Sequence, residues 1–153
     1  MGEVGPTGAA GPQGAEGLSG FVTVLNYDVT VSTAPFVSVG PSTSIPAPCQ
    51  TASYTAGENE IAIVSVDITY FSGITSSIFL APLYAQGAGG AQFASSFVAA
   101  PLTMNSWGSL HGQAPITLTA GASYRFFTGV AANANVSFGS FTCRGMVTIV
   151  RKR

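Results

Sequence analysis

The chain has 153 residues, a formal net charge of −1 and a charged-residue content of only 7 %, whereas ordinary soluble domains contain about 25 %. A net charge so close to zero gives no electrostatic basis for binding nucleic acid or an acidic membrane surface. No run of about eighteen apolar residues occurs, so we expect no membrane insertion. A chain so poor in charge exposes apolar surface unless subunits cover it, which favours an oligomer.

Glycine occupies every third position over residues 1–20: Gly2, Gly5, Gly8, Gly11, Gly14, Gly17 and Gly20. This is the collagen repeat, in which three polyproline-II chains wind around one axis where only glycine fits. A flexible glycine-rich linker is the alternative, but a linker has no reason to keep glycine in register. We therefore predict a short triple-helical stalk at 1–20 and a homotrimer. So few triplets are weak alone, so the head at 21–153 must supply most of the stability of the trimer.

Beyond residue 20 the composition changes to β-branched and aromatic residues, which alternate with polar ones as half-buried strands require. Helical periodicity and helix-forming charged residues are nearly absent. We predict strands at 21–31, 60–71, 77–84, 93–98, 106–111, 116–118, 124–130 and 141–150, with at most a short edge strand around 36–39. In the strongest strand, one face consists of Ala62, Val64, Val66, Ile68 and Tyr70. The pattern predicts an all-β antiparallel sandwich or barrel.

Two stretches of the head carry a resemblance to a known group. They are residues 120–130, Ala-Gly-Ala-Ser-Tyr-Arg-Phe-Phe-Thr-Gly-Val, and residues 145–150, Gly-Met-Val-Thr-Ile-Val. A Gly-X-Y stalk that leads into such an all-β domain resembles the collagen-stalked trimers with heads of the C1q and tumour-necrosis-factor (TNF) type. Bacterial surface filaments, spore-coat hairs and phage tail fibres have similar arrangements. The resemblance implies an extracellular, cell-surface or virion protein whose jelly-roll heads trimerise through apolar sheet faces, with loops at the distal tip.

The head contains few acidic residues that could bind a metal ion, and the chain has only two cysteines. Animal relatives of this group often bind calcium near the tip, but the acidic residues of this head are only Asp28, Glu58, Glu60 and Asp67, so we expect no metal site and no cofactor. Cys49 and Cys143 lack metal-site spacing. A disulfide between them would suit an extracellular protein, and two buried free thiols are the alternative.

The sequence offers no catalytic residues, and we expect no enzyme. His111 is the only histidine, and no Asp or Glu lies within forty residues of it along the chain, whereas acid–base catalysis needs a positioned partner. A glycosidase needs two neighbouring carboxylates. Glu58 and Glu60 are the only close pair, and beside a turn they are more simply a solvated edge.

A binding surface is the better prospect. Trp107 lies in the segment 104–111 together with Asn105 and His111. If exposed, these three side chains would suit a glycan or protein ligand, because Trp offers apolar area and the others offer hydrogen bonds. The alternative, which we favour, is that Trp107 packs in the core or at the trimer interface.

The function expected from the sequence is the distal tip of a homotrimeric extracellular fibre, an adhesin or receptor-binding protein for a cell-surface glycan or protein. Three weak sites on one trimer would give avidity. The alternative is a purely structural fibre, spore-coat or capsid-decoration protein whose head only nucleates trimerisation.

Overall fold

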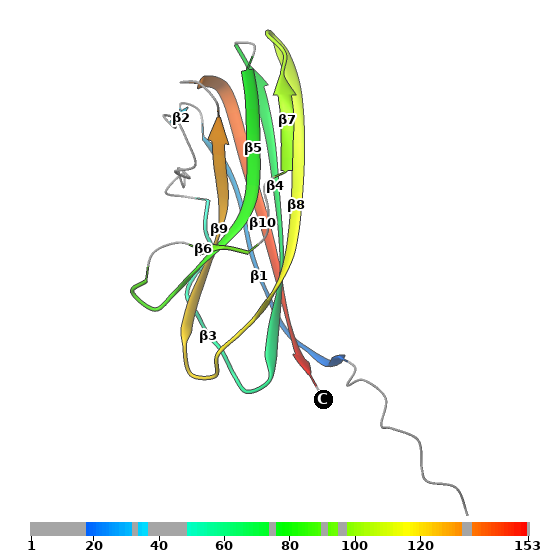
Figure 1. Ribbon diagram of the computed structural model, residues 1–153, viewed down its shortest axis with the longest axis vertical. Helices are drawn as coiled ribbons and strands as arrows, with labels where there is room; N and C mark the ends of the chain where they lie inside the picture. Colours follow the sequence, from blue (N-terminus) through cyan, green and yellow to red (C-terminus); the bar gives the residue numbers. More distant parts are fainter. Residues whose placement is uncertain are drawn as a thin grey trace, which may run out of the picture.

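Every regular element in the described part of the chain is a β-strand (Figure 1). The computed structural model describes residues 18–31, 34–36, 49–73, 76–89, 92–94, 98–132 and 136–152. The strands are β1 (Leu18–Val31), β2 (Ala34–Phe36), β3 (Tyr54–Thr55), β4 (Glu60–Ser72), β5 (Ser76–Gln86), β6 (Gln92–Phe93), β7 (Val98–Leu102), β8 (Ser106–Thr117), β9 (Ser123–Ala132) and β10 (Val136–Lys152). Within these ranges no helix is long and apolar enough to cross a membrane.

The strands form two antiparallel sheets. Sheet A has the order β1-β10-β4-β8, with β2 also paired to β10; sheet B has the order β3-β9-β5-β6, with β7 also paired to β5. From β7 onward, consecutive strands alternate between the sheets, and the first and last strands are neighbours. This is the connectivity of a jelly roll. The predicted all-β antiparallel jelly-roll sandwich is confirmed.

The observed strand bounds differ from the predicted ones at the start of β1 and in β8, which joins the predicted strands 106–111 and 116–118. They also differ around the predicted strand 93–98, where β6 ends at Phe93 and β7 begins at Val98. β1 begins at Leu18, so the residues assigned to the end of the stalk pair with β10, Gly20 opposite Arg151. The other stalk glycines, Gly2 to Gly17, lie outside the described residues. β8 runs unbroken through Pro115, because β8 is the last strand of sheet A and a missing N–H is tolerated there.

The core lies between the sheets and follows from alternation along the strands. In β4 the predicted face of Ala62, Val64, Val66, Ile68 and Tyr70 is the buried one, with each of these residues at most 3 % exposed. It belongs to one cluster with side chains of sheet B that include Ile78, Leu80, Tyr124, Phe126 and Val130. Burying one such large side chain contributes about 1.5–3 kcal/mol.

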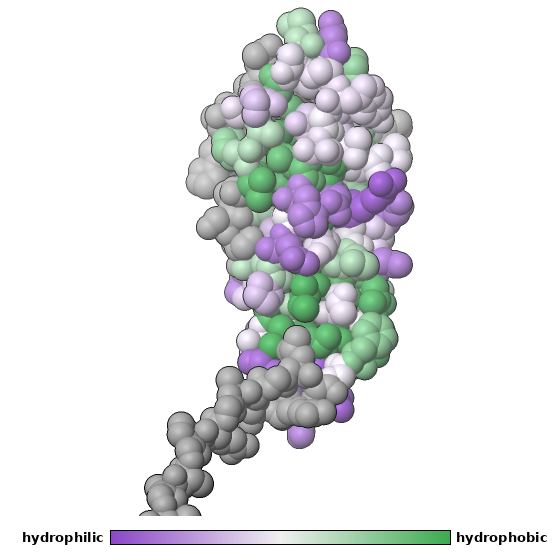
Figure 2. Space-filling model, turned by 90° about the vertical axis from the view of Figure 1, so that its right-hand side faces the viewer, coloured by the Kyte–Doolittle hydropathy of each residue, from purple (hydrophilic) through white to green (hydrophobic). Residues whose placement is uncertain are grey.

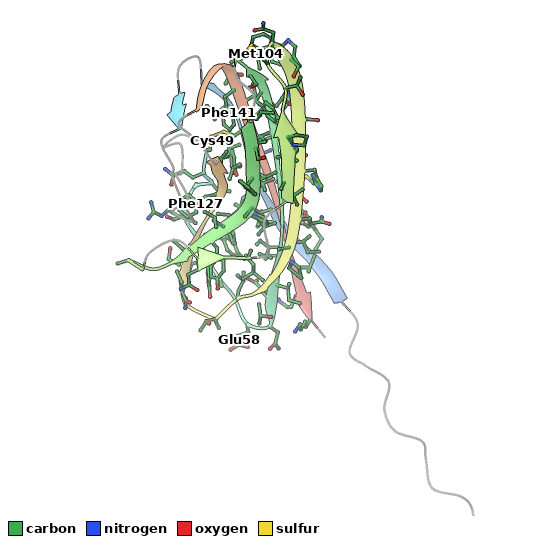
Figure 3. The ribbon with its side chains drawn as sticks, turned by 45° about the horizontal axis from the view of Figure 1, so that its top comes forward. Cys49, Glu58, Met104, Phe127 and Phe141 are labelled. Atoms are coloured by element: carbon green, nitrogen blue, oxygen red, sulfur yellow. A yellow bond between two sulfur atoms is a disulfide. The ribbon has the colours of Figure 1, made fainter. Side chains whose placement is uncertain are left out.

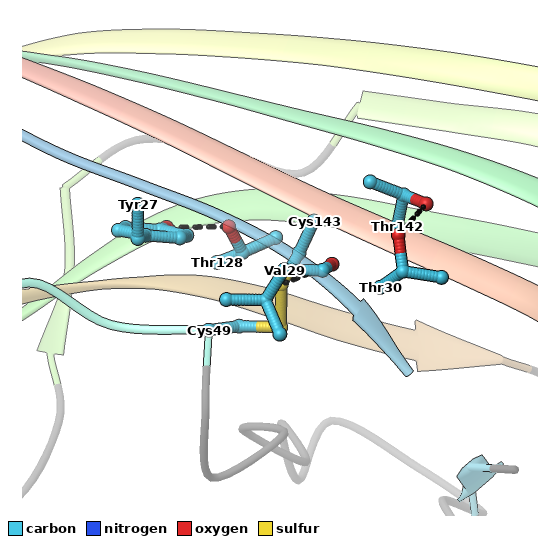
Figure 4. Close-up of a disulfide and its surroundings, with 7 residues drawn as sticks. All are labelled: Tyr27, Val29, Thr30, Cys49, Thr128, Thr142 and Cys143. Atoms are coloured by element: carbon cyan, nitrogen blue, oxygen red, sulfur yellow. Dashed lines mark hydrogen bonds between the residues drawn. A yellow bond between two sulfur atoms is a disulfide. The ribbon is translucent and has the colours of Figure 1, made fainter. Parts of the chain in front are cut away.

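One hydrogen bond and one disulfide cross the core. The Tyr27 hydroxyl of β1 is hydrogen-bonded to Thr128 Oγ1 of β9 at 2.5 Å (Figure 4). Burial, the largest influence, raises the pKa of Tyr27 well above its usual range, so this hydroxyl keeps its proton. A disulfide joins Cys143 of β10 to Cys49, which precedes β3, and both residues are fully buried (Figure 4). Of the two alternatives that the sequence left open for these cysteines, the structure contains the disulfide.

Candidate association and binding face

The outer face of sheet A, the side turned away from sheet B, presents its side chains in rows that run across the strands. Antiparallel pairing places residues of β1, β10, β4 and β8 opposite one another, and such cross-strand neighbours lie within contact distance. We call the end where β1 begins and β10 finishes the proximal end. The opposite end, which carries the turn between β7 and β8, is the distal end (Figures 1 and 3).

Apolar side chains gather at the proximal end of this face. The proximal patch consists of Phe21, Val24, Ile61, Ile63, Met146 and Val150. Phe21 is 68 % exposed, Met146 52 % and Val24 39 %. Single exposed apolar residues are common on monomers, but neighbouring large ones mark an interaction site. The side of the molecule in Figure 2 shows hydrophobic regions low on the molecule and a hydrophilic band at mid-height.

Charged side chains form the next distinct row. In the charge row, Asp28, Arg144, Asp67 and His111 lie opposite one another in strand order. The Arg144 guanidinium Nε donates to Asp28 Oδ2 at 2.9 Å. His111 Nδ1 lies 2.7 Å from Asp67 Oδ1. All four side chains are at least half exposed, so each pair contributes at most about 1 kcal/mol to the stability of the single chain.

Hydroxyl groups and aromatic rings complete the face toward its distal end. Thr30, Thr142, Thr69 and Ser109 form a row directly beyond the charges. The rings of Phe71 and Trp107 follow, with centroids 5.4 Å apart and a tilt of 56°. This distal aromatic pair ends the outer face.

Trp107 does not lie in the core, because its side chain is 64 % exposed. Its strand neighbour Gly108 explains this orientation: Gly108 takes the inward position, where a Cβ would lie 2.5 Å from the ring of Tyr70. Alternation then turns Trp107 outward. The other alternative from the sequence, burial of Trp107 between subunits, stays a prediction.

Asn105 lies in the turn between β7 and β8, close to the exposed Met104 at the distal end (Figure 3). Its φ of 57° is in the left-handed region, which Asn tolerates better than most residues. Its backbone N–H donates to the carbonyl of Ser72 at 2.8 Å, and Ser106 Oγ donates to the Thr103 carbonyl at 2.6 Å. These bonds hold the turn so that it presents Met104 and Asn105 outward.

His111 lies apart from these two candidates, at the middle of the face. Sequence reasoning missed its partner Asp67, which is 44 positions away along the chain and is brought opposite His111 by the pairing of β4 with β8. Alternation along β4 puts Asp67 on the side opposite the buried face, but only the register of the strands reveals the pair. Within the described ranges, the hydrogen-bond partner of His111 is the Asp67 carboxylate, and no hydroxyl group is bonded to the imidazole.

Glu58 and Glu60, the close acidic pair of the sequence, lie in different surroundings. Glu58 is exposed in the turn before β4, whereas Glu60 is 2 % exposed. The carboxylate of Glu60 accepts hydrogen bonds from the Tyr54 hydroxyl at 2.7 Å, from the Gly57 N–H at 2.7 Å and from Arg151 at 3.3 Å. The expectation that both were a solvated edge is wrong for Glu60, because the turn folds back and supplies donors to it.

Electrostatics at Glu60 follow from these contacts. Burial alone would raise the pKa of Glu60, but the three hydrogen bonds and the charge of Arg151 together hold that pKa below its ordinary value. Burial, and then the bond to Glu60, raise the pKa of Tyr54 to about 12. This cluster anchors the end of β10 to the turn before β4. Among the described residues, no group of three His, Cys, Asp or Glu side chains is placed to hold a metal.

Comparison with known proteins supports the fold alone. No family model matches the chain, and no curated protein matches it. Among solved structures, Eiger TNF from S. frugiperda is similar over 84 % of this chain and 92 % of that one, at 17 % identity and a TM-score of 0.50. Murine APRIL at pH 5.0 covers 82 % of this chain and 97 % of its own, at 15 % identity and a TM-score of 0.43. The likeness to Eiger confirms the TNF-like jelly roll expected from the sequence.

Proposed function

We propose that the chain is the non-enzymatic head of a homotrimeric extracellular fibre, which associates through the outer face of sheet A and presents its distal end to a cell-surface ligand. The observation that carries the proposal is the exposed proximal patch, which lies beside the point where the Gly-X-Y repeat enters the fold. Glycine at every third position is typical of a triple helix of three chains. The patch supplies the apolar surface by which the three heads associate.

The position of the patch supports this arrangement. β1 begins at Leu18 and includes Phe21 and Val24, so the patch starts within a few residues of the repeat. Three chains that leave a common triple helix therefore bring their patches close to the axis. Covering side chains such as Phe21 and Met146 contributes up to about 1.5–3 kcal/mol each, and the contribution recurs in every subunit.

Ligand binding is assigned to the distal end, where Trp107 and Asn105 lie at the opposite end of sheet A from the start of β1. An exposed indole can stack on a sugar ring or fill a protein pocket, and the Asn105 amide can donate and accept hydrogen bonds. His111 belongs instead to the charge row at mid-face. Three equal sites on one rigid head would add avidity to weak contacts.

A purely structural head is the second candidate, favoured by one observation. Phe71 and Trp107 lie on the same face as the proximal patch, so an interface that covers the whole face would also cover the aromatic pair. The head would then nucleate the stalk of a fibre, spore coat or capsid decoration and bind nothing else. Glycan-array and whole-cell binding of the chain and of Trp107→Ala separate the two candidates, because loss of binding in the variant supports the ligand site.

The test of the association itself is the mass of the chain in solution. Light scattering at micromolar concentration should give three chains. Met146→Lys should shift the equilibrium toward single chains, because a charge in the patch loses its hydration when subunits meet. Ala120→Lys is the matched control, since Ala120 is exposed in the turn between β8 and β9, outside this face. A single-chain mass for the unaltered protein would sink the proposal.

A further inference from the structure

We propose that the charge row makes association pH-dependent, with protonation of His111 tightening the trimer. The inference rests on the proposed homotrimer and concerns the regulation of the same face. It starts from the charge row itself, in which negative, positive, negative and neutral side chains, Asp28, Arg144, Asp67 and His111, lie in strand order. The rows on either side of it carry apolar, hydroxyl and amide side chains.

The formal charges of the row do not cancel when His111 is neutral. Arg144 is paired with Asp28, which leaves Asp67 with a neutral imidazole as its partner and gives the row a charge of −1. A protonated His111 brings that sum to zero. In a trimer built around one axis the deficit occurs in every subunit, so three like charges approach one another.

Among the described residues around His111, no other side chain is of a type that changes its charge near neutral pH. β4 contributes Asp67, β10 contributes Arg144, and β1 contributes Asp28 and Tyr27, whose buried hydroxyl stays protonated. β5 and β7 pack behind β8, and their described residues carry no charged side chain. Among the four side chains of the row, only His111 is of a type that can change its charge between weakly acidic and neutral pH.

Association raises the free-energy cost of the unbalanced charge in the row. In the single chain, His111 and Asp67 have side-chain exposures of 59 % and 50 %, so water screens the carboxylate. Covering the row removes that water, and an uncompensated carboxylate becomes costly. The trimer is therefore expected to bind more protons than three separate chains do. By linkage, the association constant then rises as pH falls through the imidazole range.

The experiment measures the association constant of the full chain by sedimentation velocity at about pH 8 and about pH 5.5. If each chain takes up about one proton, the constant for three chains forming one trimer should be at least about 100-fold larger at the lower pH. Where the trimer does not dissociate on dilution, the urea concentration that separates the subunits serves as the readout and should be higher at the lower pH.

Two variants isolate the row. His111→Gln keeps a polar side chain of similar size without an ionisable ring, and it should still trimerise but lose the pH dependence. Asp67→Asn leaves the row neutral when His111 is unprotonated and positive when His111 is protonated, so the pH dependence of its association should reverse in sign. The reversal is specific to this row, because a general effect of pH on folding would act on both variants alike.

The outcomes separate this inference from the trimer on which it rests. A single-chain mass at both pH values would contradict both. A trimer whose association constant changes equally with pH in the unaltered chain and in His111→Gln would overturn the inference and leave the trimer standing. Tighter association at about pH 8 than at about pH 5.5 would do the same.

Discussion

Replacing Gly145 by alanine tests how the strands that carry the association face are held. Gly145 lies in β10 directly opposite Tyr27 of β1, and a Cβ on Gly145 would overlap the Tyr27 ring. The ring has little freedom to move away, because its hydroxyl is hydrogen-bonded to Thr128 across the core. Glycine is therefore required here by the ring that covers it.

The magnitude follows from two contributions. Forcing extra volume into a packed core costs about 1–3 kcal/mol, and loss of the bond between Tyr27 and Thr128 costs about 0.5–1.5 kcal/mol. We expect Gly145→Ala to lower the free energy of unfolding by about 2–4 kcal/mol. In a Tyr27→Ala background the same change should cost nothing, since the overlapping ring is gone and glycine is itself unfavourable inside a strand.

The assay is urea denaturation followed by circular dichroism, at one fixed chain concentration so that association does not alter the comparison. The four proteins of the double-mutant cycle give a coupling energy between the two positions, expected at about 2–4 kcal/mol. An equal cost of Gly145→Ala with and without the Tyr27 ring would refute the reasoning.

Three further predictions concern the rest of the chain. The pKa of Glu60 is lowered in the folded state, so the ionised carboxylate stabilises the fold above its ordinary pKa of 4.5. This contribution disappears as pH falls through the lower folded-state pKa. In urea titrations, Glu60→Gln should therefore have a lower free energy of unfolding at neutral pH, and that free energy should fall less on acidification than in the unaltered chain. Joint replacement of Cys49 and Cys143 by alanine removes a link across 94 positions and should cost about 2–5 kcal/mol of unfolding free energy, with no loss if the bond is absent. Deletion of residues 1–17 should leave a trimeric head by light scattering, whereas a peptide of 1–17 should not associate.

Alternation along the strands explains what could be predicted from the sequence. The two faces of β4 could be predicted because successive side chains of a strand point to opposite sides of the sheet. Strand pairing could not be predicted in this way, because the residues of one strand do not specify its partner strand or the register of the pair. The proximity of His111 to Asp67 and of Cys49 to Cys143 depends on which strands become neighbours, and therefore emerged only with the fold.

The orientation of Trp107 shows a second limit of sequence reading. An aromatic residue in an apolar strand is usually buried, and sequence reasoning favoured a covered position for it. The deciding residues are Gly108 and Tyr70, whose close approach fixes which side of β8 faces inward. A glycine followed two residues later by a buried leucine, Leu110, carried that signal, but its meaning depends on a ring contributed by another strand.

The layout of the outer face and the repeat at the start of the chain agree on the polarity of association. The proximal patch lies at one end of sheet A, and the charge row lies across its middle. Subunits packed side by side in the same direction place patch beside patch, whereas opposed subunits would place Phe21 and Met146 toward the distal end of a neighbour. A collagen-type stalk also requires its chains to run in one direction from a common end. The patch and the repeat thus favour the same parallel arrangement of subunits in the proposed trimer. A substitution that prevents the patches from associating should also leave the three Gly-X-Y segments unassociated.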